Sequence, residues 1–105
     1  KLHPRLSPYK VAVLPLVKRE GMPELAREIV AEFFRAGLNA KYDEQHSIGK
    51  RYSRHDEVGT PYCLTVDGDS LKDRTVTIRD RDTTHQERIK IDEALQVVRK
   101  RVEKV

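Results

Sequence analysis

The stretch that decides the fold is SIGKRYSRHDEVGTPYCLTVD, residues 47–67. Ser47 is a favourable helix N-cap, and Gly59 followed by Pro61 is a stop signal, so the first part predicts one short helix. The apolar run from Tyr62 to Asp67 follows at once and predicts a buried strand. A helix that leads directly into a buried strand is half of a β-α-β unit, which favours a parallel sheet.

The residues before this stretch supply the other half of the unit. The run from Lys10 to Val17, KVAVLPLV, is typical of a strand that is buried on both faces. From Pro23 to Gly37 apolar side chains recur at helical spacing, which predicts an amphipathic helix. A short extended segment, Asn39 to Asp43, follows it. Because crossover connections are right-handed, we expect three parallel strands with helices packed on them.

The last third of the chain changes to an antiparallel pattern. Asp67-Gly68-Asp69 is turn chemistry, and alternation from Arg74 to Arg81 and from Glu87 to Ile91 predicts a strand pair with a basic outer face. Asp92 is expected to cap a final helix. The predicted fold class is therefore α/β, a five-stranded mixed sheet with three helices, in one domain over residues 10–105.

The composition excludes several classes of protein. No apolar run approaches the roughly 20 residues of a membrane span. The single Cys63 lies in an apolar run, so it forms no disulfide framework and favours a reducing compartment such as the cytoplasm. The four histidines are scattered without zinc spacing, and LPLVKREGMP contains no glycine-rich phosphate loop. We therefore expect no metal or cofactor site. The net charge of +4 favours an anionic partner.

The helix predicted after Ser47 carries a cluster of cations. At about 100° per residue, Lys50, Arg51, Arg54 and His55 share one arc, beside an arc that should dock on the sheet. The side chains of Lys50, Arg51 and Arg54 are candidates for contacts with nucleic-acid phosphates. The alternative is an ordinary solvated helix face.

The second candidate site is the alternation Arg79-Asp80-Arg81-Asp82, which is followed by Thr83, Thr84, His85 and Gln86. An unstacked cytosine offers an amine donor beside two acceptors, and a carboxylate presented with a guanidinium matches that edge. The alternative is a ladder of surface salt bridges worth about 0–1 kcal/mol each, and composition alone favours it.

Three stretches together resemble one known family. They are YKVAVLPLVK at residues 9–18, SIGKRYSRHDEVGTPYCLTVD at 47–67 and TVTIRDRDTTHQERIKIDE at 75–93. Almost end to end, the chain resembles the C-terminal anticodon-binding domain of class II aminoacyl-tRNA synthetases, specifically the homodimeric glycyl-tRNA synthetases. The histidyl, prolyl and threonyl enzymes share the fold, but the combination of the second and third stretches looks specific to the glycyl branch.

The resemblance implies a domain that docks the anticodon arm of glycine tRNA and reads its two cytosines. The residues it assigns fall into two groups. At the base-reading edge we expect Arg79, Arg81, Asp82, Thr83 and Gln86, and nearer the phosphates Lys50, Arg51 and Arg54. No residue is expected to be catalytic, so this fragment should not be an enzyme.

The resemblance also implies a parent protein. Its catalytic domain would lie upstream, with residues 1–9 as the linker, and would attach glycine to tRNA with ATP and Mg²⁺ as a cytoplasmic homodimer built through that domain. The main alternative is a non-catalytic, nucleic-acid-binding accessory protein that reuses the domain. The accessory subunit of mitochondrial DNA polymerase resembles such a protein. A third possibility is an interaction module whose basic face meets an acidic protein.

Overall fold

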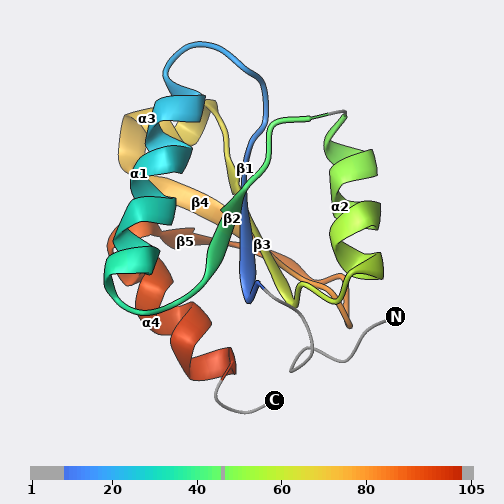
Figure 1. The fold of residues 1–105 in the computed structure, drawn as a ribbon. Coiled ribbons are helices and arrows are strands. Elements are labelled where there is room, and N and C mark those ends of the chain that lie inside the picture. The colour runs from blue at the N-terminus through green and yellow to red at the C-terminus, as the bar shows by residue number, and fades with distance from the viewer. Residues whose placement is uncertain (1–8, 46, 103–105) are drawn as a thin grey trace.

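The computed structural model describes residues 9–45 and 47–102, in which one mixed sheet is flanked by helices on both faces (Figure 1). The strands are β1 (Val11–Pro15), β2 (Ala40–Tyr42), β3 (Tyr62–Val66), β4 (Thr75–Asp80) and β5 (Gln86–Lys90). The helices of the described residues are α1 (Met22–Arg35), α2 (Ile48–Glu57), α3 (Gly68–Asp73) and α4 (Ile91–Val102).

The five strands lie in the order β2-β1-β3-β4-β5. β1 is parallel to β2 and to β3, with Val11 opposite both Ala40 and Tyr62. β4 runs antiparallel to β3 and to β5, so the sheet changes character after its third strand. The predicted five-stranded mixed sheet, with a parallel half and an antiparallel half, is confirmed.

The two faces of the sheet have different partners. Val11 and Val13 of β1 belong to the main core, which α1 and α4 cover. Ala12 and Leu14 of β1 point the other way, toward α2, which stands alone on its face in Figure 1. This alternation explains why β1 is a continuous apolar run: both faces of the strand are buried.

Helix α2 covers only part of its face of the sheet. Its apolar contacts are with β1 and with Cys63 of β3, while Val76 and Ile78 of β4 turn to the opposite core. The alternate side chains of β4 and β5 therefore lie on the face of α2, and they are polar: Thr75, Thr77, Arg79, Gln86, Arg88 and Lys90. Arg79 contacts α2, and the others form the uncovered half of that face.

The predicted helix count of three is wrong, because the segment expected to be a turn is the short helix α3. Asp67 forms a capping box with Ser70: the Ser70 N–H donates to the Asp67 carboxylate at 3.1 Å, and the Asp67 N–H donates to the Ser70 hydroxyl at 3.0 Å. The helix ends at Arg74, which has a left-handed φ of 55°. Turn residues and N-cap residues are the same types, so the two structures share one sequence signal.

The chain ends bear on two further predictions. Of the linker expected at residues 1–9, only Tyr9 is among the described residues, so the linker stays a prediction. Residues 103–105 of the expected domain also lie outside them. α4 starts at Ile91, immediately after β5, so Asp92 lies in its first turn instead of capping it.

Candidate nucleic-acid interface

Helix α2 begins and docks as its sequence predicts. The Lys50 N–H donates to the hydroxyl of the N-cap Ser47 at 3.4 Å, and Ile48 and Tyr52 pack against the small apolar cluster of β1 and β3. The Tyr52 hydroxyl shares a hydrogen bond of 2.6 Å with Thr65 of β3. Burial raises the pKa of Tyr52. One edge of the helix is thereby fixed to the sheet.

Arg51 lies beneath the helix rather than on its exposed edge, with a relative exposure of 2%. Its guanidinium donates to the carbonyl oxygens of Pro15 at 2.7 Å, Asp43 at 3.1 Å and Leu16 at 3.2 Å. Burial lowers its pKa. Arg51 thus ties together the carboxyl ends of β1 and β2, and the predicted phosphate contact does not fit this position.

Asp43, directly after β2, is the second residue beneath α2 that makes several polar contacts. It is buried, and its carboxylate accepts hydrogen bonds from the Gln45 N–H at 3.0 Å, the His55 ring at 2.9 Å and the Arg54 guanidinium. Burial raises the pKa of Asp43, but the hydrogen bonds from Gln45, Arg54 and His55 outweigh it and lower the pKa overall. Asp43 is therefore an anion that neutralises part of the charge of α2.

His55 is the buried histidine of α2, with a relative exposure of 3%. Its Nε2 faces Asp43, and its buried Nδ1 has no hydrogen-bond partner among the described residues. Burial lowers the pKa of His55, although the contact with Asp43 opposes this. A neutral ring that donates from Nε2 fits both observations, because a protonated Nδ1 would be a buried donor without an acceptor.

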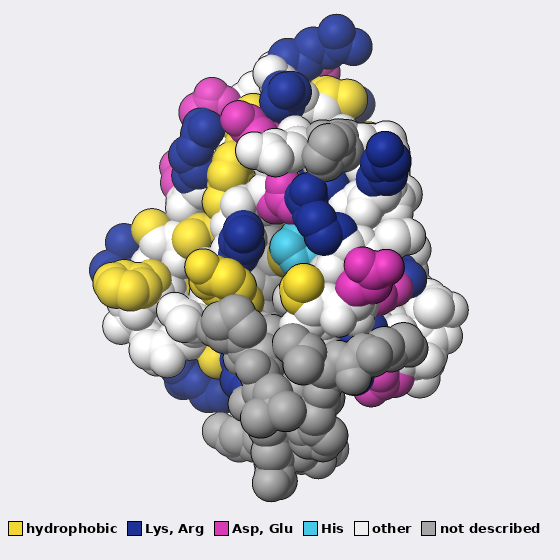
Figure 2. Space-filling view, turned by 45° about the vertical axis from the view of Figure 1, so that its right-hand side comes forward, with side chains coloured by type: hydrophobic (Ala, Val, Ile, Leu, Met, Phe, Trp, Pro, Cys, Tyr) yellow, Lys and Arg dark blue, Asp and Glu magenta, His cyan; other side chains and the backbone are white. Residues whose placement is uncertain are grey.

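The exposed edge of α2 is narrower than the predicted arc. Lys50 and Ser53 are exposed, Arg54 has 39% of its side chain exposed while it pairs with Asp43, and together with Glu57 they line a shallow hollow of about 310 Å³. Figure 2 looks onto this side of the molecule and shows basic side chains separated by acidic ones. Of the three predicted phosphate contacts, Lys50 and Arg54 are accessible.

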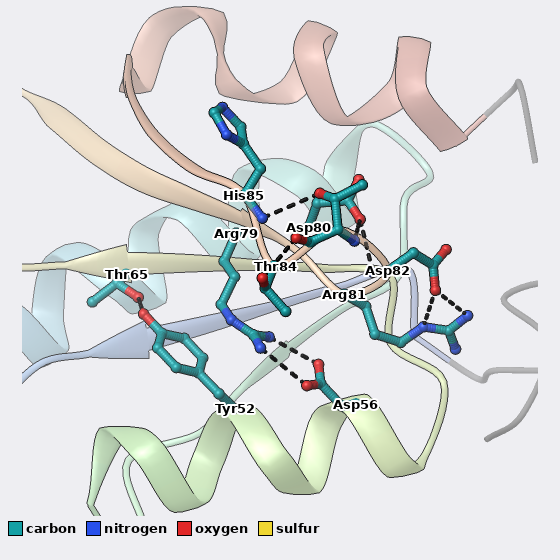
Figure 3. Close-up of polar contacts among 10 residues, drawn as sticks. Tyr52, Asp56, Thr65, Arg79, Asp80, Arg81, Asp82, Thr84 and His85 are labelled. Carbon is teal, nitrogen blue, oxygen red and sulfur yellow. Dashed lines mark hydrogen bonds and ion pairs between the residues drawn. The ribbon is translucent and has the colours of Figure 1, made fainter.

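Arg79 joins β4 to the other edge of α2 (Figure 3). Its guanidinium donates to both carboxylate oxygens of Asp56, at 2.8 and 3.1 Å, and lies 4.7 Å from the centre of the Tyr52 ring. The hydrogen bonds to Asp56 raise the pKa of Arg79. The Arg79 side chain is 11% exposed and that of Asp56 23%, so this ion pair is largely buried.

The connection from β4 to β5 is shaped by Asp80. Its carboxylate accepts hydrogen bonds from the backbone N–H groups of Asp82 at 2.8 Å and Thr83 at 3.1 Å. Thr84 adopts a left-handed φ of 59°, and its N–H donates to the Asp80 carbonyl at 2.9 Å. These bonds hold a tight turn in which Asp82, Thr83 and Thr84 are exposed. Asp80 therefore supports the turn, as Figure 3 shows.

Arg81 and Asp82 form a pair with unequal access to solvent. Arg81 is 6% exposed, and its Nε and Nη2 lie 3.0 and 2.9 Å from one carboxylate oxygen of Asp82. The backbone N–H of Arg81 donates to the carbonyl of Pro61 at 2.9 Å. The Asp82 side chain is 63% exposed, so the carboxylate is presented to solvent and the guanidinium is held behind it.

The structure thus brings the predicted base-reading residues to one place, here called the hairpin end. Thr83 and Gln86 are exposed, and Gln86 stands opposite Arg79 in the β4–β5 register. The residues of the hairpin end are Arg79, Arg81, Asp82, Thr83 and Gln86. Lys50 does not join them, because it lies in the first turn of α2, about 9 Å along the helix axis from Asp56 at about 1.5 Å per residue.

Sequence reasoning left two neighbours of this surface unassigned. Asp56 pairs with Arg79, and a partner on a distant strand gives no local signal in the sequence. Arg88 donates to Thr75 at 2.9 Å and to Asp67 at 3.3 Å, on the uncovered half of the face of α2. The alternation of residues 87–91 already indicates that Arg88 and Lys90 point outward.

The described part of the chain contains neither a candidate metal centre nor a candidate membrane-spanning helix. Over residues 9–45 and 47–102, no group of three His, Cys, Asp or Glu side chains is placed to hold a metal ion. None of the helices in the same residues is long and apolar enough to cross a membrane.

Comparison with known proteins places these features in a family. The chain matches the anticodon binding domain family over residues 10–101. It is 56% identical over 102 residues to the glycine–tRNA ligase of Rhodopirellula baltica, a match that covers 97% of this chain and 19% of the ligase. The chain therefore spans about a fifth of the length of that curated relative.

Solved structures show the same fold. The RNA binding domain of threonyl-tRNA synthetase from Cryptosporidium parvum Iowa II is 27% identical with a TM-score of 0.81, over 95% of this chain and 25% of that one. Prolyl-tRNA synthetase from Cryptosporidium parvum, complexed with L-proline and AMP, has a TM-score of 0.88 at 23% identity, over 98% and 22% of the two chains. Because the family match extends over nearly all of the sheet and its helices, the chain belongs to the anticodon binding domain family.

Proposed function

We propose that this chain binds the anticodon arm of glycine tRNA, as the anticodon-binding part of a glycine–tRNA ligase. The observation that carries the proposal is the hairpin end, where an exposed carboxylate, hydroxyl and amide gather beside helix α2. The family match and the similarity to a glycine–tRNA ligase support the same conclusion. A net charge of +4 favours a polyanionic partner.

The hairpin end is proposed to read the two cytosines of the glycine anticodon. Cytosine presents an amine donor beside ring-nitrogen and carbonyl acceptors. The Asp82 carboxylate can accept from the amine, while the Gln86 amide can serve either kind of group and Thr83 adds a hydroxyl. Arg81 is paired with Asp82 and Arg79 with Asp56, so each guanidinium acts with a carboxylate beside it.

The burial of the two arginines refines their proposed roles. A bidentate pair satisfies its own hydrogen bonds, so a base must compete with it. We therefore assign first contact with the bases to Asp82, Thr83 and Gln86, the exposed members. Arg79 and Arg81 hold the carboxylates in place and supply donors to the cytosine acceptors once a base has docked.

The phosphates are proposed to meet the exposed edge of α2. Lys50 and Arg54 are accessible there, and phosphate contacts supply affinity with little sequence information. Arg51 is reassigned from phosphate binding to holding the ends of β1 and β2, because its two terminal guanidinium nitrogens donate to three backbone carbonyl groups.

The activity of the whole protein is part of the proposal. The parent would be a cytoplasmic ligase that uses ATP and Mg²⁺ to attach glycine to tRNA, with its homodimer contacts and its ATP site in a catalytic domain outside this chain. The alternative of a non-catalytic accessory protein has less support, since 56% identity connects this chain to a ligase. Sequencing the gene upstream of Lys1 distinguishes an intact catalytic domain from a degenerate one.

The experiment that tests the proposal is an NMR titration of the 105-residue chain. The probes are the anticodon stem-loop of glycine tRNA and a stem-loop in which the two cytosines are changed. We expect weak binding that declines with salt, a preference for the native loop, and shifts in the amides of the hairpin end. Equal binding of the two loops would overturn the base-reading assignment, and no binding of either would overturn docking as well.

A further inference from the structure

The side of α2 that faces away from the hairpin end carries a groove, of which the site described above uses only the end beside Lys50 and Arg54. Two hollows of about 460 and 180 Å³ both include Lys41 and Arg54 in their linings, and the hollow of about 310 Å³ beside Lys50 shares Arg54 with them. Because one side chain belongs to all three, they adjoin one another. We call them the β2–α2 groove; it extends from Arg27 on α1 past β2 to Lys50.

We propose that the β2–α2 groove is a second RNA contact surface, which takes the sugar–phosphate backbone of the same anticodon arm. This inference rests on the proposed function and adds residues to it. The residues it assigns are Arg27, Lys41 and Tyr42, together with Tyr9 at the far end.

The charges of the groove favour an anionic occupant. Asp43 is buried, is paired with the Arg54 guanidinium and accepts a hydrogen bond from the His55 ring. A second carboxylate, Glu44, accepts a hydrogen bond of 2.8 Å from the Tyr42 hydroxyl and lies 4.0 Å from Arg27. A third, Glu57, lies at the other end of the groove, where it lines the same hollow as Lys50 and Arg54. Lys41 is exposed, and no described carboxylate lies within ion-pair distance of its ammonium group. Its charge is therefore available to a phosphate.

Two tyrosines hold the cations at the rim of the groove. The Arg27 guanidinium lies 4.6 Å from the centre of the Tyr42 ring, and the Lys41 ammonium 5.5 Å from that of Tyr9. A cation above an aromatic face keeps donors free at its edges, so it can still bind a phosphate oxygen. Cations alternating with aromatic rings are the composition of surfaces that follow a nucleic-acid strand.

The groove and the hairpin end lie on opposite edges of the same helix. Asp56 contacts Arg79 of β4, whereas Arg54 and His55 contact Asp43 after β2. An RNA that uses both surfaces spans α2, with Lys50 and Arg54 between them. Because contacts between cations and phosphates carry little sequence information, the groove should add affinity without changing which bases are preferred.

The test is the double variant Arg27→Glu/Lys41→Glu of the 105-residue chain, measured by fluorescence anisotropy with a labelled glycine anticodon stem-loop over a salt series. The matched control is Lys72→Glu/Lys100→Glu, which makes the same charge change at exposed positions of α3 and α4. Urea unfolding checks that each variant folds, and Arg27→Gln/Lys41→Gln replaces the first variant if it does not.

We expect the groove variant to bind about tenfold more weakly at low salt, with a salt slope smaller by about 1.5, since each lost phosphate contact removes about 0.7–0.9. The control should change affinity less than about twofold, and the preference for the native loop should persist in both. Equal losses in the groove and control variants, with the wild type still discriminating, would overturn the groove alone. If the wild type binds no stem-loop, both proposals fail.

Discussion

The guanidinium of Arg79 and the carboxylate of Asp56 join β4 to α2 through two hydrogen bonds of 2.8 and 3.1 Å. The apolar contacts of α2 with the sheet are few, because among residues 9–45 and 47–102 only Ala12, Leu14 and Cys63 form the buried cluster on that face. The ion pair therefore contributes to the position of α2 as well as to the chemistry of the hairpin end. It thereby fixes the exposed edge of α2, which carries Lys50 and Arg54, relative to the hairpin end.

Replacing Asp56 tests this link. Asp56→Ala leaves the largely buried Arg79 without its partner, so we expect the free energy of unfolding to fall by about 2 kcal/mol, between the cost for an exposed pair and that for a fully buried one. Urea denaturation followed by circular dichroism measures the change. Glu57→Ala is the control, because Glu57 directly follows Asp56 in the helix and is exposed. Equal destabilisation by the two changes would refute a special role for the pair.

Arg51 and Lys50 are adjacent in sequence, but Arg51 is buried and Lys50 is exposed. Arg51→Met removes donors from three carbonyl groups, two of them in buried contacts, and we expect a loss of about 2–3 kcal/mol in unfolding free energy at about 1 kcal/mol per carbonyl. Lys50→Met should leave stability within about 0.5 kcal/mol and lower the salt slope of RNA binding by about 0.8. Urea denaturation and fluorescence anisotropy on both variants check this. If Arg51→Met instead lowers the salt slope and leaves stability unchanged, Arg51 is a phosphate contact after all.

The sheet could be predicted from the sequence because its signals are local. The continuous apolar run from Lys10 to Val17 indicates a strand buried on both faces, and the alternation from Arg74 to Arg81 indicates one buried on a single face. The short helix α3 could not be separated from a turn, since Asp67 suits both. The family motifs supplied the domain type.

The roles of single cations could not be predicted in the same way. Arg51 and Lys50 look alike in sequence, but the arc that contains Arg51 and His55 faces the ends of β1 and β2. There Arg51 donates to backbone carbonyl groups, and His55 contacts the Asp43 carboxylate. Which arc of a polar helix is buried depends on partners far away in the chain. The Arg79–Asp56 pair, separated by 23 residues, is invisible for the same reason.

Arg81 should affect base choice more than Lys50 does. Arg81→Ala removes the group that holds the exposed carboxylate of Asp82, so the preference for the native over the cytosine-changed loop should fall by about tenfold, a typical loss of 1–3 kcal/mol for one base contact. Lys50→Ala should weaken both loops alike. Anisotropy titrations of both variants with both loops measure the ratio. Equal loss of preference would show that the division between bases and phosphates is wrong.

Cys63 should be inert while the chain is folded. It is 2% exposed on β3, and burial raises its pKa to about 12, so very little thiolate forms near neutral pH. We expect a disulfide reagent to modify it only as fast as the sheet opens, and rapidly in denaturing urea. A Ser53→Cys variant, with a thiol on the exposed edge of α2, supplies the matched reactive position. Comparable rates at both thiols in native buffer would contradict the burial of Cys63.

The pH dependence of stability should report on His55. Burial lowers its pKa below the ordinary value of 6.5, so between that value and the folded one the unfolded chain holds the extra proton. Acidification therefore favours unfolding, by up to about 1.4 kcal/mol per pH unit in that interval. The groups facing the ring are Asp43, Arg54 and Lys41. The pKa of Asp43 is lowered from 3.8, so that carboxyl loses its contribution only in stronger acid.

A series of urea denaturations between pH 8 and about pH 5 isolates the histidine, because Asp43 remains charged there. The wild type should lose stability as the pH falls below about 6.5, and His55→Gln, which keeps a donor for Asp43 but does not titrate, should lose much less. His85→Gln controls for the removal of a histidine from an exposed position. A wild-type profile that is flat over this range, or one that His55→Gln leaves unchanged, would contradict a neutral, buried ring at the base of α2.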